Sequence, residues 1–213
     1  MKPTNKYAES KNKFMKNFLF FLILFLSFQF STQADDISEL EIEGISIGDS
    51  LLKFVKKEKI LSSRKYTYAD DEFYSLDIWD DSFKDYPVIQ FHLKKGDKNY
   101  EIHGVSGALI FGETGVFYPQ SEKECAEKKK TVERDIDKLF INASKDSNKF
   151  IGQDDYDPEA IRQDTYYRLD NGEVWLQCVT WGKKAKKKHN IMDNLRITIL
   201  SDYFFQWMQT KAY

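Results

Sequence analysis

An apolar run near the amino end constrains this chain more than any other feature, because it decides where the rest of the chain folds. The run covers residues 18–30, and Lys11, Lys13 and Lys16 precede it. A secretory signal peptide typically has a basic N-terminal region, about a dozen apolar residues and a cleavage site with small residues. A helix that crosses a bilayer needs roughly 20 apolar residues, so the run is short for a membrane span.

Residues 1–34 are therefore predicted to be a signal peptide, with Met15 as a compact alternative start to Met1. Cleavage after Ala34, with Thr32 two residues before it, leaves a mature chain that begins at Asp35. An uncleaved membrane anchor is the alternative interpretation. The sequence thus predicts a periplasmic or secreted protein that is soluble after export and meets the membrane only during export.

Charge and length bound what the mature chain can be. The leader holds five lysines and one glutamate, so the totals of 32 basic and 34 acidic residues fall to 27 and 33, a net charge of −6. That balance argues against nucleic acid as a partner, since nucleic-acid binding requires a net basic surface. The remaining 179 of 213 residues contain no repeat, and residues 35–213 are expected to form a single domain.

The hydrophobic pattern of this domain predicts an α+β fold. A long helix is expected from Ser121, where Glu124 completes a capping box, to about residues 140–143. Short helices are expected near the N-terminus, at about 50–60, and at the C-terminus, after Ser201-Asp202. The polar segments 146–158 and 182–190 are expected to be loops. An antiparallel sheet of about six strands should pack against the long helix, with strands near 72–80, 88–93, 100–111, 162–169, 174–181 and 195–200.

Asn171-Gly172 is the sharpest local signal, because this pair accommodates the positive φ angles of a two-residue type I′ turn. It predicts that the strands on either side form a hairpin, referred to below as the second hairpin. With Asn171 and Gly172 as the two turn residues, Arg168 is expected to lie opposite Trp175.

The two cysteines, Cys125 and Cys178, are predicted to form a disulfide. An exported chain meets an oxidising environment, in which a pair of cysteines is usually joined. Cys125 lies on the apolar stripe of the long helix, and Cys178 lies with Val174 and Leu176 on the more apolar face of the second hairpin, so both should point into one interface. Two free thiols are the alternative. The lack of a C-x-x-C spacing argues against a redox-active pair.

A possible metal site arises from the strands at 88–93 and 100–111. His92, Glu101 and His103 are expected on one face of this hairpin, and two imidazoles with a carboxylate could hold zinc. A solvated sheet surface explains the same pattern without a metal, and no cofactor is predicted. The clustered aspartates of segment 146–158 lack the spacing of an EF-hand and are expected to lie in a solvated loop.

No sequence motif indicates a particular catalytic chemistry. The patterns G-x-x-x-x-G-K and H-E-x-x-H are absent from the chain, and G-x-S-x-G occurs once, at residues 44–48, a short pattern that alone does not define a catalytic serine. The basic run at 183–188 could contact anionic lipid, an acidic polymer or nucleic acid, and a solvated loop is the simpler interpretation.

The face of the second hairpin that points away from Cys178 is the remaining candidate for a binding site. Aromatic rings beside an arginine and an amide recur at binding surfaces and on sugar-stacking platforms. Burial of this face under the first or last helix is the alternative. Because side chains alternate along a strand, the face carries Tyr166, Arg168, Trp175, Gln177 and Trp181.

Two resemblances bear on function. The segment from Ile45 to Leu52, I-S-I-G-D-S-L-L, resembles the glycine-capped first helix of small outer-membrane assembly lipoproteins of the SmpA/OmlA type, which implies an envelope-associated module. The composition, rich in Lys, Asn, Asp and Phe, resembles that of small secreted proteins from AT-rich bacteria and implies no activity. These observations favour a non-enzymatic binding or envelope-associated module, whose partner could be an envelope protein or a glycan. A metal-assisted hydrolase built on His92, Glu101 and His103 is the alternative function.

Overall fold

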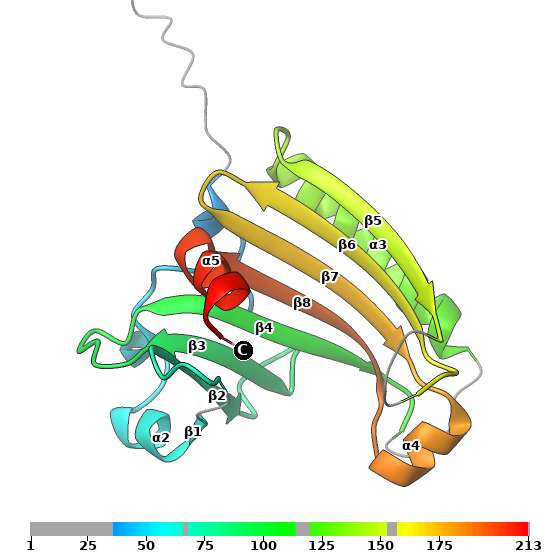
Figure 1. Cartoon of the computed structure of the whole chain (residues 1–213), viewed down its shortest axis with the longest axis horizontal. Helices are drawn as coiled ribbons and strands as arrows, with labels where there is room; N and C mark the ends of the chain where they lie inside the picture. Colours follow the sequence, from blue (N-terminus) through cyan, green and yellow to red (C-terminus); the bar gives the residue numbers. More distant parts are fainter. Residues whose placement is uncertain (1–35, 66–67, 114–119, 153–156, 213) are drawn as a thin grey trace, which may run out of the picture. The chain divides into compact units, whose positions relative to one another are not determined.

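The structure, a computed structural model, describes residues 36–65, 68–113, 120–152 and 157–212, which belong to one compact unit that spans Asp35–Tyr213 (Figure 1). The predicted signal peptide lies outside the described residues. Among the described residues no helix is long and apolar enough to cross a membrane. In chain order the elements are η1 (Ile37–Glu39), η2 (Leu51–Lys53), α2 (Lys57–Ser62), β1 (Arg64–Lys65), β2 (Phe73–Trp79), β3 (Val88–Lys94), β4 (Ile102–Phe111), α3 (Ser121–Leu139), β5 (Ser144–Ile151), β6 (Ile161–Leu169), β7 (Gly172–Thr180), α4 (Lys183–His189), β8 (Asp193–Ser201) and α5 (Asp202–Thr210).

The strands of the described ranges form one antiparallel sheet in the order β1-β2-β3-β4-β8-β7-β6-β5. Each half of the chain makes a meander of four strands, and the two meanders join where β4 pairs with β8. This joint runs from Gly104 opposite Leu200 to Phe111 opposite Asp193. The helix α3 connects the two halves in sequence, between β4 and β5.

The prediction of a sheet of about six strands against one long helix is wrong. The described ranges hold eight strands, and three helices (α3, α4 and α5) have seven residues or more. The strand β5 was predicted to be mostly loop because seven of its eight residues are exposed, which leaves no apolar alternation to detect. It pairs with β6 along its whole length, as a solvated edge strand can do. The strand β1 has only two residues.

Three local helix predictions also need correction. The segment expected to be one helix at 50–60 is a 3-10 turn, η2, followed by the short helix α2; Ser50 donates its hydroxyl to the carbonyl of Asn99 at 2.5 Å instead of capping a helix. The long helix begins at Ser121 itself, so the capping box with Glu124 does not form. The segment expected to be a basic loop contains α4, which is anchored by a buried ion pair of 2.5 Å between Lys186 and Asp193.

The turn of the second hairpin differs from the predicted type I′ turn. Its loop residues are Asp170 and Asn171, since Leu169 pairs with Gly172, and neither Asn171 nor Gly172 has a positive φ. Glycine is required at position 172 for space, because an added Cβ would lie 2.2 Å from the carbonyl oxygen of Leu200. The register shifts by two residues relative to the prediction, which keeps every side chain on its predicted face.

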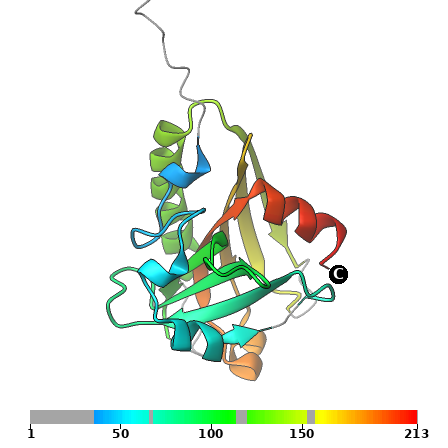
Figure 2. The ribbon, with the colours of Figure 1, turned by 90° about the vertical axis from the view of Figure 1, so that its left-hand side faces the viewer.

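The two faces of the sheet are covered unequally. Figure 2 shows α3 and the N-terminal segment on one side and α5 on the other. The first side holds the main core, to which the N-terminal segment contributes Ile37, Ile45 and Leu51, all buried. The second side holds a smaller aromatic cluster, in which Phe204 and Trp207 of α5 pack on Phe73 and Leu200.

The predicted disulfide between Cys125 and Cys178 is confirmed. It joins α3 to β7, with 5.9 Å between the two Cα atoms, and both residues are buried. The two residues are 53 positions apart in the chain. A crosslink of this span restricts the unfolded chain and therefore favours the fold.

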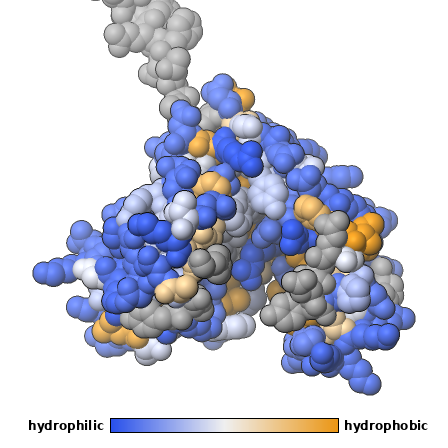
Figure 3. Space-filling model, in the orientation of Figure 1, coloured by the Kyte–Doolittle hydropathy of each residue, from blue (hydrophilic) through white to orange (hydrophobic). Residues whose placement is uncertain are grey.

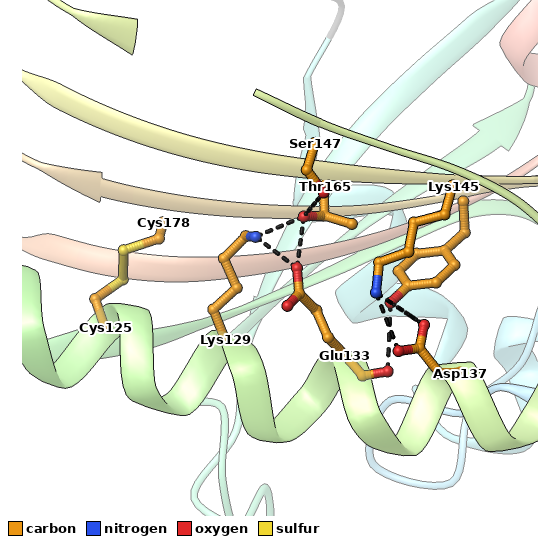
Figure 4. A network of polar contacts seen from close by, with 9 residues as sticks. Cys125, Lys129, Glu133, Asp137, Lys145, Ser147, Thr165 and Cys178 are labelled. Carbon is orange, nitrogen blue, oxygen red and sulfur yellow. Dashed lines mark hydrogen bonds and ion pairs between the residues drawn. A yellow bond between two sulfur atoms is a disulfide. The ribbon is translucent and has the colours of Figure 1, made fainter. Parts of the chain in front are cut away.

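A network of polar contacts continues the attachment of α3 to the sheet beyond the disulfide (Figure 4). The ammonium of Lys129 donates to Glu133 Oε1 at 2.7 Å and to Thr165 Oγ1 at 2.5 Å, and the hydroxyl of Thr165 also donates to Glu133. Burial alone would raise the pKa of Glu133, but the hydrogen bonds from Lys129 and Thr165 outweigh it and lower the pKa. One turn further along α3, Asp137 accepts hydrogen bonds from Tyr167 at 2.8 Å and from Lys145 at 2.9 Å.

Loss of the disulfide should lower the free energy of unfolding by about 4 kcal/mol, the amount the chain-entropy model assigns to a loop of this length. Urea unfolding of the wild type with and without reductant measures the effect. The Cys125→Ala/Cys178→Ala double variant should match the reduced wild type and should not respond to reductant. Equal stability of oxidised and reduced wild type would contradict the prediction.

Candidate functional site

A row of polar and aromatic side chains crosses the face of the sheet opposite α3. Its members alternate with apolar residues, such as Leu176, Ile197 and Phe91, that point into the main core. The strand register places them directly beside one another. From β6 to β2, the successive partners are Tyr166, Trp175, Thr198, Ser106, Gln90 and Asp77.

The helix α5 forms a wall at one end of this face. It begins directly after β8, where the hydroxyl of Ser201 accepts a hydrogen bond from the amide of Phe204 at 3.3 Å. The chain therefore turns back over the sheet, with Phe204 and Met208 beside the polar row. Figure 1 shows α5 in front of the sheet, near one end of the strands, with much of their length left uncovered.

Two adjoining pockets lie on this face, and together they are called the groove below. The larger has a volume of about 370 Å³ and lies beside α5, and the smaller has a volume of about 140 Å³. Gln90, Ser106 and Arg196 line both pockets. Figure 3 shows the hollow in this face, with mostly hydrophilic residues around it.

Most polar groups on the floor of the groove already have partners in the protein. Asp77 accepts hydrogen bonds from Lys65 at 2.5 Å and from the amide of Gln90 at 3.0 Å. The buried hydroxyls of Ser106 and Thr198 bond to each other at 2.9 Å. These contacts hold the side chains in place and balance the charge of Lys65 against that of Asp77.

Arg196 differs from its neighbours in the groove. It projects from β8 as an exposed residue, opposite Gln177 of β7. Within the part of the chain that the structure describes, its guanidinium makes no hydrogen bond and no ion pair. An arginine fork with five N–H donors is thus available at the centre of the groove.

Trp175 is fixed beside the groove by its polar edge. Its indole N–H donates to Glu173 at 2.6 Å, and Glu173 also accepts a hydrogen bond from Arg168 at 3.2 Å. The ring meets Tyr166 edge to face, with 5.8 Å between the centroids. Because its N–H is occupied, the half-buried indole offers the groove only the apolar surface of its ring.

The structure brings some of the predicted binding residues together and separates others. Trp175 and Gln177 line the groove, and Tyr166 supports Trp175. Arg168 lies opposite Glu173, so the expected pairing with Trp175 is wrong. Trp181 follows the end of β7, where its backbone amide donates to Asp193, and it does not line the groove. The last helix covers part of this face, but both tryptophans remain half-buried.

The residues proposed for a metal occupy unlike surroundings. His92 is buried against Phe204 with its Nδ1 bonded to the hydroxyl of Tyr68 at 2.7 Å, whereas Glu101 is exposed at the start of β4. His103 lies at the irregularity between β3 and β4 and stacks edge to face on Phe73. No group of three or more His, Cys, Asp or Glu side chains that could hold a metal occurs among the described residues.

The acidic segment 146–158 and the basic segment 182–190 mainly make contacts within the protein. Asp154 and Asp155 lie outside the described residues, and Asp157 is buried, where it accepts a hydrogen bond from the amide of Gly182 at 2.5 Å. That contact fixes the start of α4. Apart from the buried Lys186, the lysines of α4 are exposed.

Sequence reasoning missed the floor of the groove. The signal that could have identified it is the alternation of β8, in which Arg196 and Thr198 interrupt a run of apolar residues. A comparison of the chain with models of protein families, with curated proteins and with solved structures found no match. The interpretation of the groove therefore depends on its own chemistry.

Protonation of His92 should make the protein less stable in acid. Burial, and to a smaller extent the charge of Arg196, lower the pKa of His92 to about 4, while Asp77 opposes the shift. The unfolded chain therefore binds more protons between its ordinary pKa of about 6.5 and pH 4, and stability falls as the pH falls through this window. Titration of His92 should therefore lower the free energy of unfolding by about 3 kcal/mol between pH 7 and pH 4.

Urea unfolding at pH 7 and pH 4 tests this expectation. The His92→Asn variant has no titratable group at position 92. Its free energy of unfolding should fall by about 3 kcal/mol less than that of the wild type between pH 7 and pH 4. The paired carboxylates lose stability in acid in both proteins, so the comparison isolates the histidine. Parallel behaviour of His92→Asn and wild type would rule the mechanism out.

Proposed function

We propose that this protein is an exported, non-enzymatic binding module and that the groove is its ligand site. The buried disulfide supports the exported state, because such crosslinks persist in oxidising compartments. An envelope protein or a glycan remains the proposed class of partner.

The observation that carries the proposal is the guanidinium of Arg196, which makes no hydrogen bond or ion pair with the described residues, in a groove where the charge of Lys65 is balanced by Asp77. Asp77 balances Lys65 at 2.5 Å, and burial keeps His92 neutral at ordinary pH. Arg196 is an exposed residue that lines both pockets of the groove. Small-ligand sites combine a concave apolar wall with a few placed polar groups, and the groove has both.

The rigidity of the groove also favours binding. Its floor belongs to central strands, and the indole of Trp175 is held by a hydrogen bond to Glu173. Side chains that are already in place lose little conformational entropy when a ligand arrives. Because Arg196 is exposed and makes no hydrogen bond or ion pair with the described residues through its side chain, its removal should not disturb the fold.

A ligand that fills the groove should raise the melting temperature of the wild type and not that of a groove variant. At a concentration of 100 times its Kd, a ligand adds about 2.7 kcal/mol of stability, which is roughly 5–10 °C for a domain of this size. The measurement is a thermal-shift screen of sugars, organic acids, peptides and phosphates. Arg196→Gln and Trp175→Ala should abolish the shift.

Arg134→Gln is the matched control, because Arg134 is an exposed arginine of α3, remote from the groove lining, that donates a hydrogen bond to the hydroxyl of neighbouring Thr131. It should respond to the ligand as the wild type does. Shifts that survive in Arg196→Gln and in Trp175→Ala would place the ligand elsewhere. The absence of any ligand-dependent shift across all four classes would refute the groove as a binding site.

A further inference from the structure

We infer that the groove selects a saccharide that carries a carboxylate group, an inference that rests on the proposed function and names the ligand class of the same site. Three sets of groups in the groove match three parts of such a molecule. They are the guanidinium of Arg196, the hydroxyl and amide row of the floor, and the ring surface of Trp175.

The positive charge of the groove favours a ligand with a planar anionic group. Lys65 is neutralised by Asp77, and His92 is buried and neutral, so Arg196 contributes the uncompensated charge of the groove lining. Guanidinium and carboxylate form two parallel hydrogen bonds in one plane, a geometry that a lysine cannot reproduce. A single carboxylate therefore matches both the charge and the shape of the free group.

The hydrogen-bonding groups on the floor of the groove favour a ligand with hydroxyl groups. Ser106 and Thr198 bond to each other, which uses one hydroxyl proton and leaves the other to donate. Gln90 donates its amide to Asp77 and keeps its carbonyl oxygen as an acceptor. Donors and acceptors side by side suit sugar hydroxyls, which do both. An alkyl carboxylate would cover these groups and leave them without partners.

The apolar side chains that line the groove favour a ligand that also has an apolar face. The indole N–H of Trp175 is occupied by Glu173, so the ring meets a ligand through its apolar surface. Leu200, Phe204 and Met208 extend this surface towards α5. A pyranose ring presents C–H groups on one face and hydroxyls on its rim. The volume of about 370 Å³ lies at the small end of the range of roughly 300–1,000 Å³ for small-ligand sites, which suits a terminal sugar or a disaccharide.

Calorimetric titration of the exported protein with a panel of carboxylated oligosaccharides tests the inference. The panel contains trigalacturonate and a glucuronate-terminated tetrasaccharide, each beside its methyl ester, which removes the charge alone. At least one acid should bind, and its ester should bind at least tenfold more weakly. Arg196→Gln and Trp175→Ala should each weaken binding at least tenfold, Arg196→Lys should recover only part of the loss, and Arg134→Gln should have no effect.

Hexanoate and inorganic phosphate separate failure of this inference from failure of the proposed function. Groove-dependent binding of either one, with no response to any acidic sugar, would overturn the saccharide assignment and leave the groove as a binding site. Equal binding of acid and ester, or acid binding that survives Arg196→Gln, would overturn the role of the carboxylate. Failure of every probe, together with a negative thermal-shift screen, would refute both.

Discussion

A disulfide and a buried polar network fasten α3 to one face of the sheet, and the rest of the structure depends on this attachment. The apolar stripe of α3 is narrow, with Cys125 and Ile136 as its buried apolar residues. Apolar burial alone would hold such a helix weakly, so the crosslink to Cys178 and the contacts from Lys129 to Thr165 complete the interface. Because these polar groups are satisfied, their burial does not cost what unpaired groups would cost.

With α3 and the N-terminal segment on one face of the sheet, α5 is the helix that packs on the opposite face. A sheet with eight strands is wider than one short helix, so part of that face meets solvent and must be polar. The polar row from Tyr166 to Asp77 meets this demand, and the two pockets of the groove lie along it. The groove is thus a consequence of an unequal division of helices between two faces, and the Arg196 guanidinium lies in it without a hydrogen bond or ion pair to the described residues.

Sequence patterns predicted those parts of the fold that depend on alternation of apolar residues. They located β2, β3, β4 and the second hairpin, placed Cys178 on the face towards α3, and put Trp175 and Gln177 on the other face. They failed where charge replaces apolar burial, as in β5, which is exposed on both sides, and in α4, whose buried Lys186 is paired with Asp193. Arg196 interrupts the apolar run of β8, which is the signal that sequence reasoning missed, but its lack of a hydrogen bond or ion pair with the described residues is seen only once the strands are arranged.

The tight turn between β6 and β7 joins parts of the chain that are made at very different times. Asn171 accepts a hydrogen bond from the amide of Ile37, 134 residues earlier, and from its amide nitrogen it donates to Asp36, 135 residues earlier. The same residue's carbonyl accepts from Asp202 at the start of α5. A chain that grows from its amino end therefore presents its first folded residues long before their partners exist. Non-local pairing of this kind slows folding, and it implies that the final structure closes only when the C-terminal helix has been synthesised.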